Sequence, residues 1–360
     1  MHTIAPDDVV ATHDEGQANE REPLLVLDPL AAFLDERGLG DGEIEVEPVG
    51  EGHSNVTFVI RRGDWEAVIR RPPRGPLPPS AHDVLREARV LGATAGQARV
   101  PRVLATCADE AVIGAPFYVM EKVEGHVVTG TIAPELDNPA DKQRMAEELV
   151  DALVEVHAVD WQACGLEGFG KPTGYLERQL RRFGGLWEHN RTREIAAVER
   201  VGGWLRDNLP ESGPATIVHG DYRLGNVMFA PGSPARLNAI FDWEMATIGD
   251  PLADLGYLCT LWVDRDDPDL GMFELSAVTR QEGFPRRSEL VERYEARSGR
   301  SMTDIRWYQT LALWKSVVFM EGNYRRAVSG TTDDPFLKQF GDGVIQLATR
   351  AEETAFGGAS

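Results

Sequence analysis

The sequence predicts an α+β, bilobal fold, in which a small lobe built on an antiparallel β-sheet precedes a larger, mainly helical lobe. Short strand-like runs crowd into residues 44–120 with one amphipathic helix among them, whereas apolar residues recur at helical spacing beyond residue 138. The length of 360 residues also exceeds the roughly 100–200 residues of one domain. We therefore predict a flexible tail at residues 1–22, the small lobe at 23–123 and the large lobe at 124–360.

The small lobe is predicted to order its elements as β-β-β-α-β-β after one short helix. Apolar residues at helical spacing between Leu24 and Leu34 stop at a run of glycines, and glycine-containing turns separate the strand-like runs that follow. Five prolines between residues 72 and 79 form a stiff connector; Ser80 then begins a helix, with Asp83 three residues on as in a capping box. The predicted strands cover residues 44–49, 56–61, 65–70, 100–106 and 112–120.

The large lobe is predicted to be a set of helices interrupted by one β-rich segment at residues 216–243. Asn138 and Pro139 begin the first long helix, because proline is favoured in the first turn. No internal repeat of 20–50 residues is evident. The remaining predicted helices cover residues 174–191, 193–208, 251–263, 286–297, 304–328 and 336–354.

Composition excludes several classes of partner. With 37 basic and 58 acidic residues the formal net charge is −21, which argues against binding to nucleic acid or to anionic lipid. The three cysteines lie far apart with no CxxC spacing, so a disulfide framework is not expected and a reducing compartment fits. No signal peptide and no apolar stretch of about 18 residues occurs, so we expect a cytoplasmic protein without a membrane partner. The sequence gives no oligomeric state.

The densest chemical signal is a polar turn between two short apolar strands, which holds His219, Asp221, Arg223 and Asn226. A third apolar run ends at Asp242, which lies 21 residues beyond Asp221. This spacing suits phosphoryl transfer, in which one carboxylate accepts the proton of the attacking hydroxyl while an amide oxygen and a second carboxylate hold Mg²⁺ on the nucleotide phosphates. The alternative is that the turn residues only close a β-turn and that Asp242 caps the next segment.

The string VHGDYRLGNVMF, followed by IFDWEMATIGDPLADLGYL, resembles the signature of the aminoglycoside phosphotransferase family of protein-kinase-like enzymes. It is most similar to the subgroup related to the kinase-like domains found alongside some acyl-CoA dehydrogenases. The resemblance runs from about residue 45 to 330. It implies a protein-kinase-like fold with ATP in the cleft between the lobes.

The resemblance also implies roles for individual residues. Asp221 corresponds to the catalytic base, and Asn226 and Asp242 correspond to the ligands of Mg²⁺. His219 corresponds to a structural histidine of the catalytic loop, for which packing and hydrogen bonding are expected rather than proton transfer. Asp254, on the following helix, resembles a buried carboxylate that accepts hydrogen bonds from that loop.

Further groups are expected to contact the nucleotide phosphates. Gly50 and Gly52 lie in a turn between two strands, where kinases place a phosphate-covering loop, and Ser54 could donate a hydrogen bond to the β-phosphate. The third glycine of the protein-kinase loop is missing, and Asn55 stands there. Arg223 corresponds to a lysine that touches the γ-phosphate in protein kinases, although a surface arginine is the alternative.

The phosphate-anchoring lysine of kinases has no counterpart here, because the first lysine of the chain is Lys122. Arg70 occupies the matching strand position, with Glu87 on the next helix as its expected partner. The alternative is an arginine on the surface of an edge strand. In the connector between the lobes, the backbone near Glu121 and Val123 is expected to bind the adenine edge, which does not distinguish ATP from GTP.

The acceptor is expected to be the hydroxyl group of a small molecule. No segment long enough to dock a peptide follows Asp242, which disfavours a protein kinase. Both an aminoglycoside and an anionic or neutral alcohol, such as a hydroxyacyl-CoA, stay open, and so does a non-catalytic pseudokinase. The candidate acceptor wall consists of Trp314, Glu321, Asn323, Tyr324 and Arg325, with the acidic loop at residues 264–269.

Overall fold

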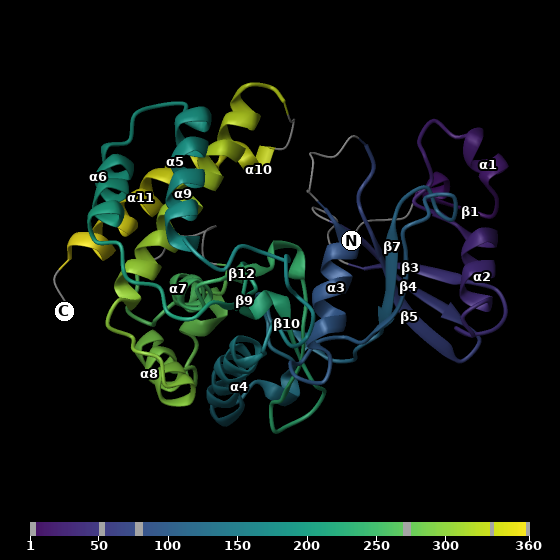
Figure 1. The fold of residues 1–360 in the computed structure, drawn as a ribbon, viewed down its shortest axis with the longest axis horizontal. Coiled ribbons are helices and arrows are strands. Elements are labelled where there is room, and N and C mark those ends of the chain that lie inside the picture. Colours follow the sequence, from purple (N-terminus) through teal and green to yellow (C-terminus); the bar gives the residue numbers. More distant parts are fainter. Residues whose placement is uncertain (1–4, 50–54, 76–81, 269–274, 332–334, 358–360) are drawn as a thin grey trace. The chain divides into compact units, whose positions relative to one another are not determined.

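The computed structural model describes residues 5–49, 55–75, 82–268, 275–331 and 335–357 (Figure 1). Its chain divides into two compact units. The first unit consists of Met1–Glu124 together with Ala239–Glu244, and the second of Gly125–Asn238 together with Met245–Ser360. The chain thus re-enters the first unit for six residues within and after strand β11 (Leu237–Ile240).

An antiparallel five-stranded sheet forms the centre of the first unit, with strand order β3-β4-β5-β7-β6 (Figure 1). Alternate residues of its strands, such as Phe58 and Ile60, are buried against Leu30 and Leu34 of α2. Along the chain, the strands and helices of this unit follow one another in the predicted order, which confirms that prediction. Its elements are α2 (Leu27–Asp35), β3 (Glu45–Val49), β4 (Val56–Arg62), β5 (Trp65–Arg71), α3 (Val84–Thr94), β6 (Val103–Cys107) and β7 (Phe117–Glu121).

Helix α3 begins later than predicted. Asp83 is its N-cap, and the Asp83 carboxylate accepts a hydrogen bond from the backbone N–H of Arg86 at 2.9 Å. Ser80, the predicted start, lies outside the described residues. An aspartate three residues into a helix and an aspartate that caps it give the same sequence pattern, which explains the error.

Residues 5–22, which were expected to form a tail, hold short elements instead. A 3₁₀ turn (Pro6–Asp8), β1 (Val9–Val10) and α1 (His13–Gln17) precede β2 (Leu25–Val26), which pairs in parallel with β1. The Asp8 carboxylate forms an ion pair with the Arg74 guanidinium and accepts a hydrogen bond from it at 2.6 Å. Contacts with residues far along the chain produce no hydrophobic periodicity in a polar stretch, so the sequence did not reveal these short elements.

The second unit is mainly helical, as predicted. Asn138 caps its first long helix by accepting a hydrogen bond from the N–H of Asp141 at 3.0 Å. Strand β8 pairs with β10, and β9 pairs with β12. Its elements are β8 (His126–Val127), α4 (Pro139–Ala158), α5 (Tyr175–Asn190), α6 (Ala196–Asp207), β9 (Thr216–Val218), β10 (Val227–Phe229), β12 (Thr247–Gly249), α7 (Leu252–Leu261), α8 (Arg287–Ser298), α9 (Ile305–Val328), α10 (Pro335–Lys338) and α11 (Phe340–Phe356).

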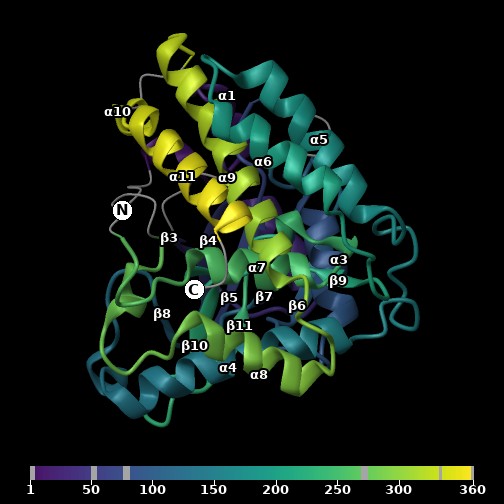
Figure 2. The ribbon, with the colours of Figure 1, turned by 90° about the vertical axis from the view of Figure 1, so that its left-hand side faces the viewer.

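Helices α5, α6, α9 and α11 lie together (Figure 2), and their buried side chains form one apolar cluster of this unit. Trp314 of α9 is buried within it, and its indole N–H donates to the carbonyl of Val198 at 3.1 Å. Trp314 is therefore a core residue, and its prediction as part of an acceptor wall is wrong. Among the described helices, none is long and apolar enough to cross a membrane.

Candidate active site

The catalytic loop predicted from the sequence leaves β9 through a turn that only glycine fits. Gly220 has φ +88°, and a Cβ atom on it would lie 2.9 Å from the backbone oxygen of Met245. Left-handed backbone and close approach both exclude other side chains at this position. The turn places His219 and Asp221 on either side of the glycine.

Asp221 carries a carboxylate whose two oxygens each accept a hydrogen bond. The Tyr257 hydroxyl donates to Oδ1 at 2.7 Å, and the Asn226 amide donates to Oδ2 at 2.7 Å. Arg223 Nε lies 3.6 Å from Oδ2, and the Asp221 side chain is 24% exposed. The carboxylate is thus fixed in orientation while part of it stays accessible to a reactant.

Tyr257 was not predicted from the sequence. It lies on α7, three residues after Asp254, so helical spacing places both on one face of the helix. Burial and the neighbouring Asp221 carboxylate raise the pKa of Tyr257 well above its ordinary value. The hydroxyl therefore stays protonated and donates to the carboxylate at any physiological pH.

Asn226 ends the 3₁₀ turn of the loop and is almost completely buried. Its amide Nδ2 donates both to the backbone oxygen of Asp221 at 2.8 Å and to the Asp221 carboxylate. Both amide protons are thus used, which leaves Oδ1 as the group that can face a ligand. An amide oxygen suits Mg²⁺, which prefers hard oxygen ligands.

Asp254 holds the backbone of this loop through hydrogen bonds. Its carboxylate is 1% exposed and accepts hydrogen bonds from the N–H groups of His219 at 2.6 Å and Gly220 at 2.8 Å, with His157 Nε2 at 3.2 Å. Burial alone would raise the pKa of Asp254, but His157 and the loop N–H groups outweigh it and hold the pKa below its ordinary value. This is the buried, loop-binding carboxylate predicted from the sequence.

His219 is fully buried beside this carboxylate. Its Nδ1 accepts a hydrogen bond from the N–H of Asp221 at 3.2 Å, and its ring packs edge-on against Tyr222. Because the ring is enclosed and bound to backbone, the side chain shapes the loop.

In the first unit, Arg70 connects two carboxylates. Its Nε donates to Glu87 Oε2 at 2.9 Å and its Nη2 donates to Asp242 Oδ1 at 2.7 Å. The Arg70 side chain is 14% exposed, which excludes the alternative of a surface arginine. Although burial opposes its charge, Glu87 and the other nearby anionic groups raise the pKa of Arg70, so the guanidinium is permanently charged.

Glu87 binds the backbone that follows Asp242 as well. Its second oxygen accepts a hydrogen bond from the N–H of Trp243 at 3.2 Å. Asp242 has φ +64°, which is uncommon for a residue with a side chain and is typical of functional sites. No described residue donates to Oδ2 of Asp242, so this oxygen can serve as a ligand of Mg²⁺.

The phosphate-covering turn falls mostly outside the described residues, which exclude Gly50, Gly52 and Ser54. Asn55 is described and is 6% exposed. Its amide donates to Glu244 at 3.4 Å, and its oxygen lies 3.2 Å from His82 Nδ1. Asn55 thus ties the start of β4 to the residues before α3.

Part of the predicted adenine-binding backbone is already engaged. The N–H of Glu121 donates to the carbonyl of Arg102 at 2.9 Å, and the Glu121 carboxylate accepts from the N–H of Arg102 at 3.0 Å. The N–H of Glu121 therefore already has a backbone acceptor within the protein. Val123 lies beyond the end of β7 and is half-buried.

Glu321, predicted to line the acceptor site, is completely buried instead. Its carboxylate accepts hydrogen bonds from Thr192 N and Oγ1 at 2.8 and 2.7 Å, and Arg193 Nη2 lies 3.6 Å away. The residue therefore ties α9 to the segment between α5 and α6. The buried carboxylate is therefore occupied by the backbone N–H and the hydroxyl of Thr192, a contact that the helical pattern around Glu321 does not reveal.

The neighbouring predicted acceptor residues, Tyr324 and Arg325, contact residues at and just after the end of α5. The Tyr324 ring lies 5.1 Å from the Arg193 guanidinium, and Arg325 donates to the carbonyl of His189. Asn323 is half-buried on the same helix. The structure thus gives Tyr324 and Arg325 contacts within the helical unit and does not gather the four residues around the catalytic loop.

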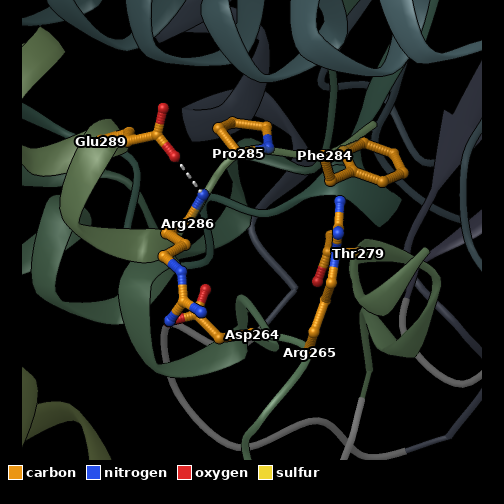
Figure 3. Close-up of a pocket in the computed structure, with 7 residues that line it drawn as sticks. All are labelled: Asp264, Arg265, Thr279, Phe284, Pro285, Arg286 and Glu289. Carbon is orange, nitrogen blue, oxygen red and sulfur yellow. Dashed lines mark hydrogen bonds between the residues drawn. The ribbon is translucent and has the colours of Figure 1, made fainter. Parts of the chain in front are cut away.

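The acidic loop predicted beside the acceptor borders a cavity of about 220 Å³ (Figure 3). Its acids have arginine partners: Asp266 pairs with Arg286 at 3.2 Å, and Asp267 pairs with Arg287 and Arg350. Asp269 lies outside the described residues. No residue of the catalytic loop lines the cavity, whose lining consists of Asp264, Arg265, Thr279, Phe284, Pro285, Arg286 and Glu289.

Most of this chain matches a known protein family and proteins of known sequence. The family described as "Phosphotransferase enzyme family" (APH) matches residues 45–297. Acyl-CoA dehydrogenase family member 10 of Mus musculus is 34% identical over 318 residues, which cover 87% of this chain and 29% of that protein. Family member 11 of Homo sapiens is 32% identical over 320 residues, covering 86% and 40%. The chain thus spans less than half the length of these relatives.

Solved structures agree with the fold. A Ralstonia eutropha protein described as a candidate aminoglycoside phosphotransferase is 31% identical with a TM-score of 0.80, covering 91% of this chain and 97% of that chain. The aminoglycoside phosphotransferase APH(4)-Ia, in a complex with AMP-PNP and hygromycin B, is 18% identical with a TM-score of 0.60, covering 92% and 100%. The predicted kinase-like fold, with an antiparallel sheet unit and a helical unit, is confirmed.

Proposed function

Because the chain belongs to the APH phosphotransferase enzyme family, we propose that it is an ATP- and Mg²⁺-dependent kinase of a small molecule with a hydroxyl group. One observation carries the assignment of the base. Asp221 is held at both oxygens, by Tyr257 and by Asn226, yet keeps 24% of its side chain exposed. A fixed and accessible carboxylate is what a general base requires.

In the proposed reaction, the acceptor hydroxyl gives its proton to Asp221 as its oxygen bonds to the γ-phosphorus of ATP. The bond between the γ-phosphorus and its bridging oxygen breaks, and ADP leaves with that oxygen. The hydrogen bonds to Tyr257 and Asn226 keep the carboxylate directed at the acceptor. This arrangement lowers the barrier mainly by orientation.

Asn226 Oδ1 and Asp242 Oδ2 are the oxygens that would hold Mg²⁺. When bound, Mg²⁺ supplies positive charge to the transferring phosphoryl group. Arg70 adds a second positive charge for the α- or β-phosphate, in the role that lysine has in other kinases. Its contacts with Glu87 and Asp242 fix the guanidinium plane before a nucleotide arrives.

The acceptor has two candidate classes. Relatives at 30–34% identity carry names of acyl-CoA dehydrogenases, which favours a hydroxyacyl-CoA or a related alcohol. The Ralstonia eutropha structure favours an aminoglycoside by its description alone. GTP stays an alternative nucleotide, since a structure with 16% identity is a GDP complex of aminoglycoside 2'-phosphotransferase-IIIa.

A phosphotransfer screen tests the proposal. Purified protein with ATP and Mg²⁺ is assayed for ADP release against aminoglycosides, choline-like alcohols and hydroxyacyl-CoAs, with GTP in parallel. Asp221→Asn should lower kcat by about 10³-fold or more and leave the thermal stabilisation by ATP and Mg²⁺ intact. The stabilisation should disappear in Asp242→Ala.

Two results would oppose the kinase assignment. Equal stabilisation by ATP with and without Mg²⁺, together with no acceptor-dependent turnover, would favour a pseudokinase. Turnover that survives Asp221→Asn would assign the base to another residue.

A further inference from the structure

Resting on the proposed function, we propose that Lys315 of α9, together with Arg182 and Phe183 of α5, binds a carboxylate or phosphate group of the acceptor. The acceptor is then an anionic alcohol, and a polycation is excluded from this position. We refer to these three residues as the cation cluster. They belong to none of the groups assigned above to the base, the metal or the nucleotide.

The cation cluster is organised around one aromatic ring. The Lys315 ammonium lies 4.8 Å from the centroid of the Phe183 ring, and the Arg182 guanidinium carbon lies 5.9 Å from the same centroid. Two cations that share one ring repel each other, and an anion between them would relieve that repulsion. Helices α5 and α9 pack side by side, so both cations are held on a rigid support.

Lys315 has no carboxylate partner among the described residues, although it is half-buried. Two other lysines do have one: Lys122 pairs with Glu66 at 2.7 Å and Lys142 pairs with Asp137 at 2.6 Å. Removing a charge from water without a counter-ion is costly. A half-buried, unpaired ammonium therefore indicates a position whose counter-ion is supplied by a ligand.

The electrostatic surroundings connect Lys315 with the catalytic loop. Burial lowers the pKa of Lys315 to about 8; the Asp254 carboxylate opposes this fall and the Arg182 guanidinium adds to it. Asp254 is the residue that binds the N–H groups of His219 and Gly220. The charge of Lys315 is thus coupled to the carboxylate that holds the loop of the proposed base.

The start of α5, about two turns before Arg182, packs against β12, the strand that pairs with β9. A Cβ atom on Gly249 of β12 would lie 2.5 Å from the Tyr175 ring at the start of α5. Burial and the Asp254 and Asp250 carboxylates raise the pKa of Tyr175. The α5 helix therefore runs from the support of the catalytic loop to the cation cluster, which suits an acceptor bound along it.

Steady-state kinetics with matched probes tests the proposal. The acceptors are 3-hydroxybutyrate and its methyl ester, glycerol 3-phosphate and glycerol, and the aminoglycoside kanamycin. For whichever anionic probe is phosphorylated, Lys315→Gln should raise KM by about 10-fold or more with kcat within about 2-fold, and Lys315→Arg should restore KM. The control Lys338→Gln changes an exposed lysine of α10 and should leave both constants unchanged.

A second readout does not depend on turnover. The chain has five lysines, so reductive ¹³C-methylation gives few signals, and the signal absent from Lys315→Gln belongs to Lys315. This signal should titrate near pH 8 and move to higher pH with 3-hydroxybutyrate or with glycerol 3-phosphate, which separates a carboxylate from a phosphate ligand. The neutral ester and glycerol should leave it unchanged.

The outcomes separate the two proposals. Turnover of kanamycin or glycerol that is unaffected by Lys315→Gln would overturn the cation cluster and keep the kinase. A selective shift of the Lys315 titration without turnover of any probe would keep the anion site and count against the kinase. Equal shifts with sulfate and with chloride would mean an adventitious ion only and would overturn the site.

Discussion

Removal of the Tyr257 hydroxyl is the most direct test of how the proposed base is held. In Tyr257→Phe the ring keeps its packing on α7, while the 2.7 Å hydrogen bond to Asp221 Oδ1 is lost. The Asn226 bond to Oδ2 remains. The substitution therefore frees one oxygen of the carboxylate without removing the base.

The size of the effect follows from the nature of that bond. A hydrogen bond to a charged group contributes about 1.5–3 kcal/mol, and 1.4 kcal/mol equals a factor of ten. The lost bond also holds the carboxylate in one orientation, so its loss leaves the base less well directed at the acceptor hydroxyl. At neutral pH we expect kcat to fall by about 10-fold or more, with the affinity for ATP unchanged.

The assay is kcat and kcat/KM at neutral pH, measured on the acceptor identified by the screen. Tyr308→Phe is the matched control, because its hydroxyl donates to another carboxylate, Asp250, at 2.8 Å in the same unit. Equal kcat and kcat/KM for wild type and Tyr257→Phe would refute the claim that this hydroxyl holds the base. A thermal midpoint lowered equally in both variants, with activity loss in both, would attribute the effect to packing.

Three further predictions concern other parts of the structure. Arg70→Ala should weaken ATP binding, seen as a loss of ATP-dependent thermal stabilisation, and should destabilise the fold by about 3 kcal/mol, because Glu87 is left buried without its cation; denaturant titration measures the second effect. Gly220→Ala should lower kcat by at least about 10-fold, measured beside its melting temperature, because φ +88° and a 2.9 Å contact displace the loop. Above pH 8, KM for an anionic acceptor should rise toward the KM of Lys315→Gln as Lys315 loses its proton, because the neutral amine no longer attracts the anion; a KM that stays flat to pH 10 would contradict it.

Local pattern was sufficient for most of the fold. Helical periodicity located α5 through α9 within a few residues, and the β-rich start was readable from alternation. The single helix predicted over residues 336–354 is two helices, α10 (Pro335–Lys338) and α11 (Phe340–Phe356). The catalytic loop was readable because its polar residues are contiguous in sequence. Arg70 and Glu87 were paired in advance because a strand position and a helix position in the same unit correspond to a known arrangement.

Contacts between distant segments could not be read in this way. Glu321 was expected to line the acceptor site, yet its carboxylate binds Thr192, which lies 129 residues earlier in the chain. Tyr257 and Lys315 were overlooked for the same reason, because a tyrosine or a lysine on a helix is ordinary until its neighbours are known. What selects these residues is tertiary burial, to which a single sequence gives no direct access.

The Glu87 carboxylate supports two parts of the proposed site at once. One oxygen of this carboxylate binds Arg70, the proposed phosphate anchor, and the other binds the backbone beside Asp242, the proposed Mg²⁺ ligand. Because both bonds start from one side chain of α3, a displacement of this helix would disturb the proposed phosphate anchor and the proposed metal ligand together.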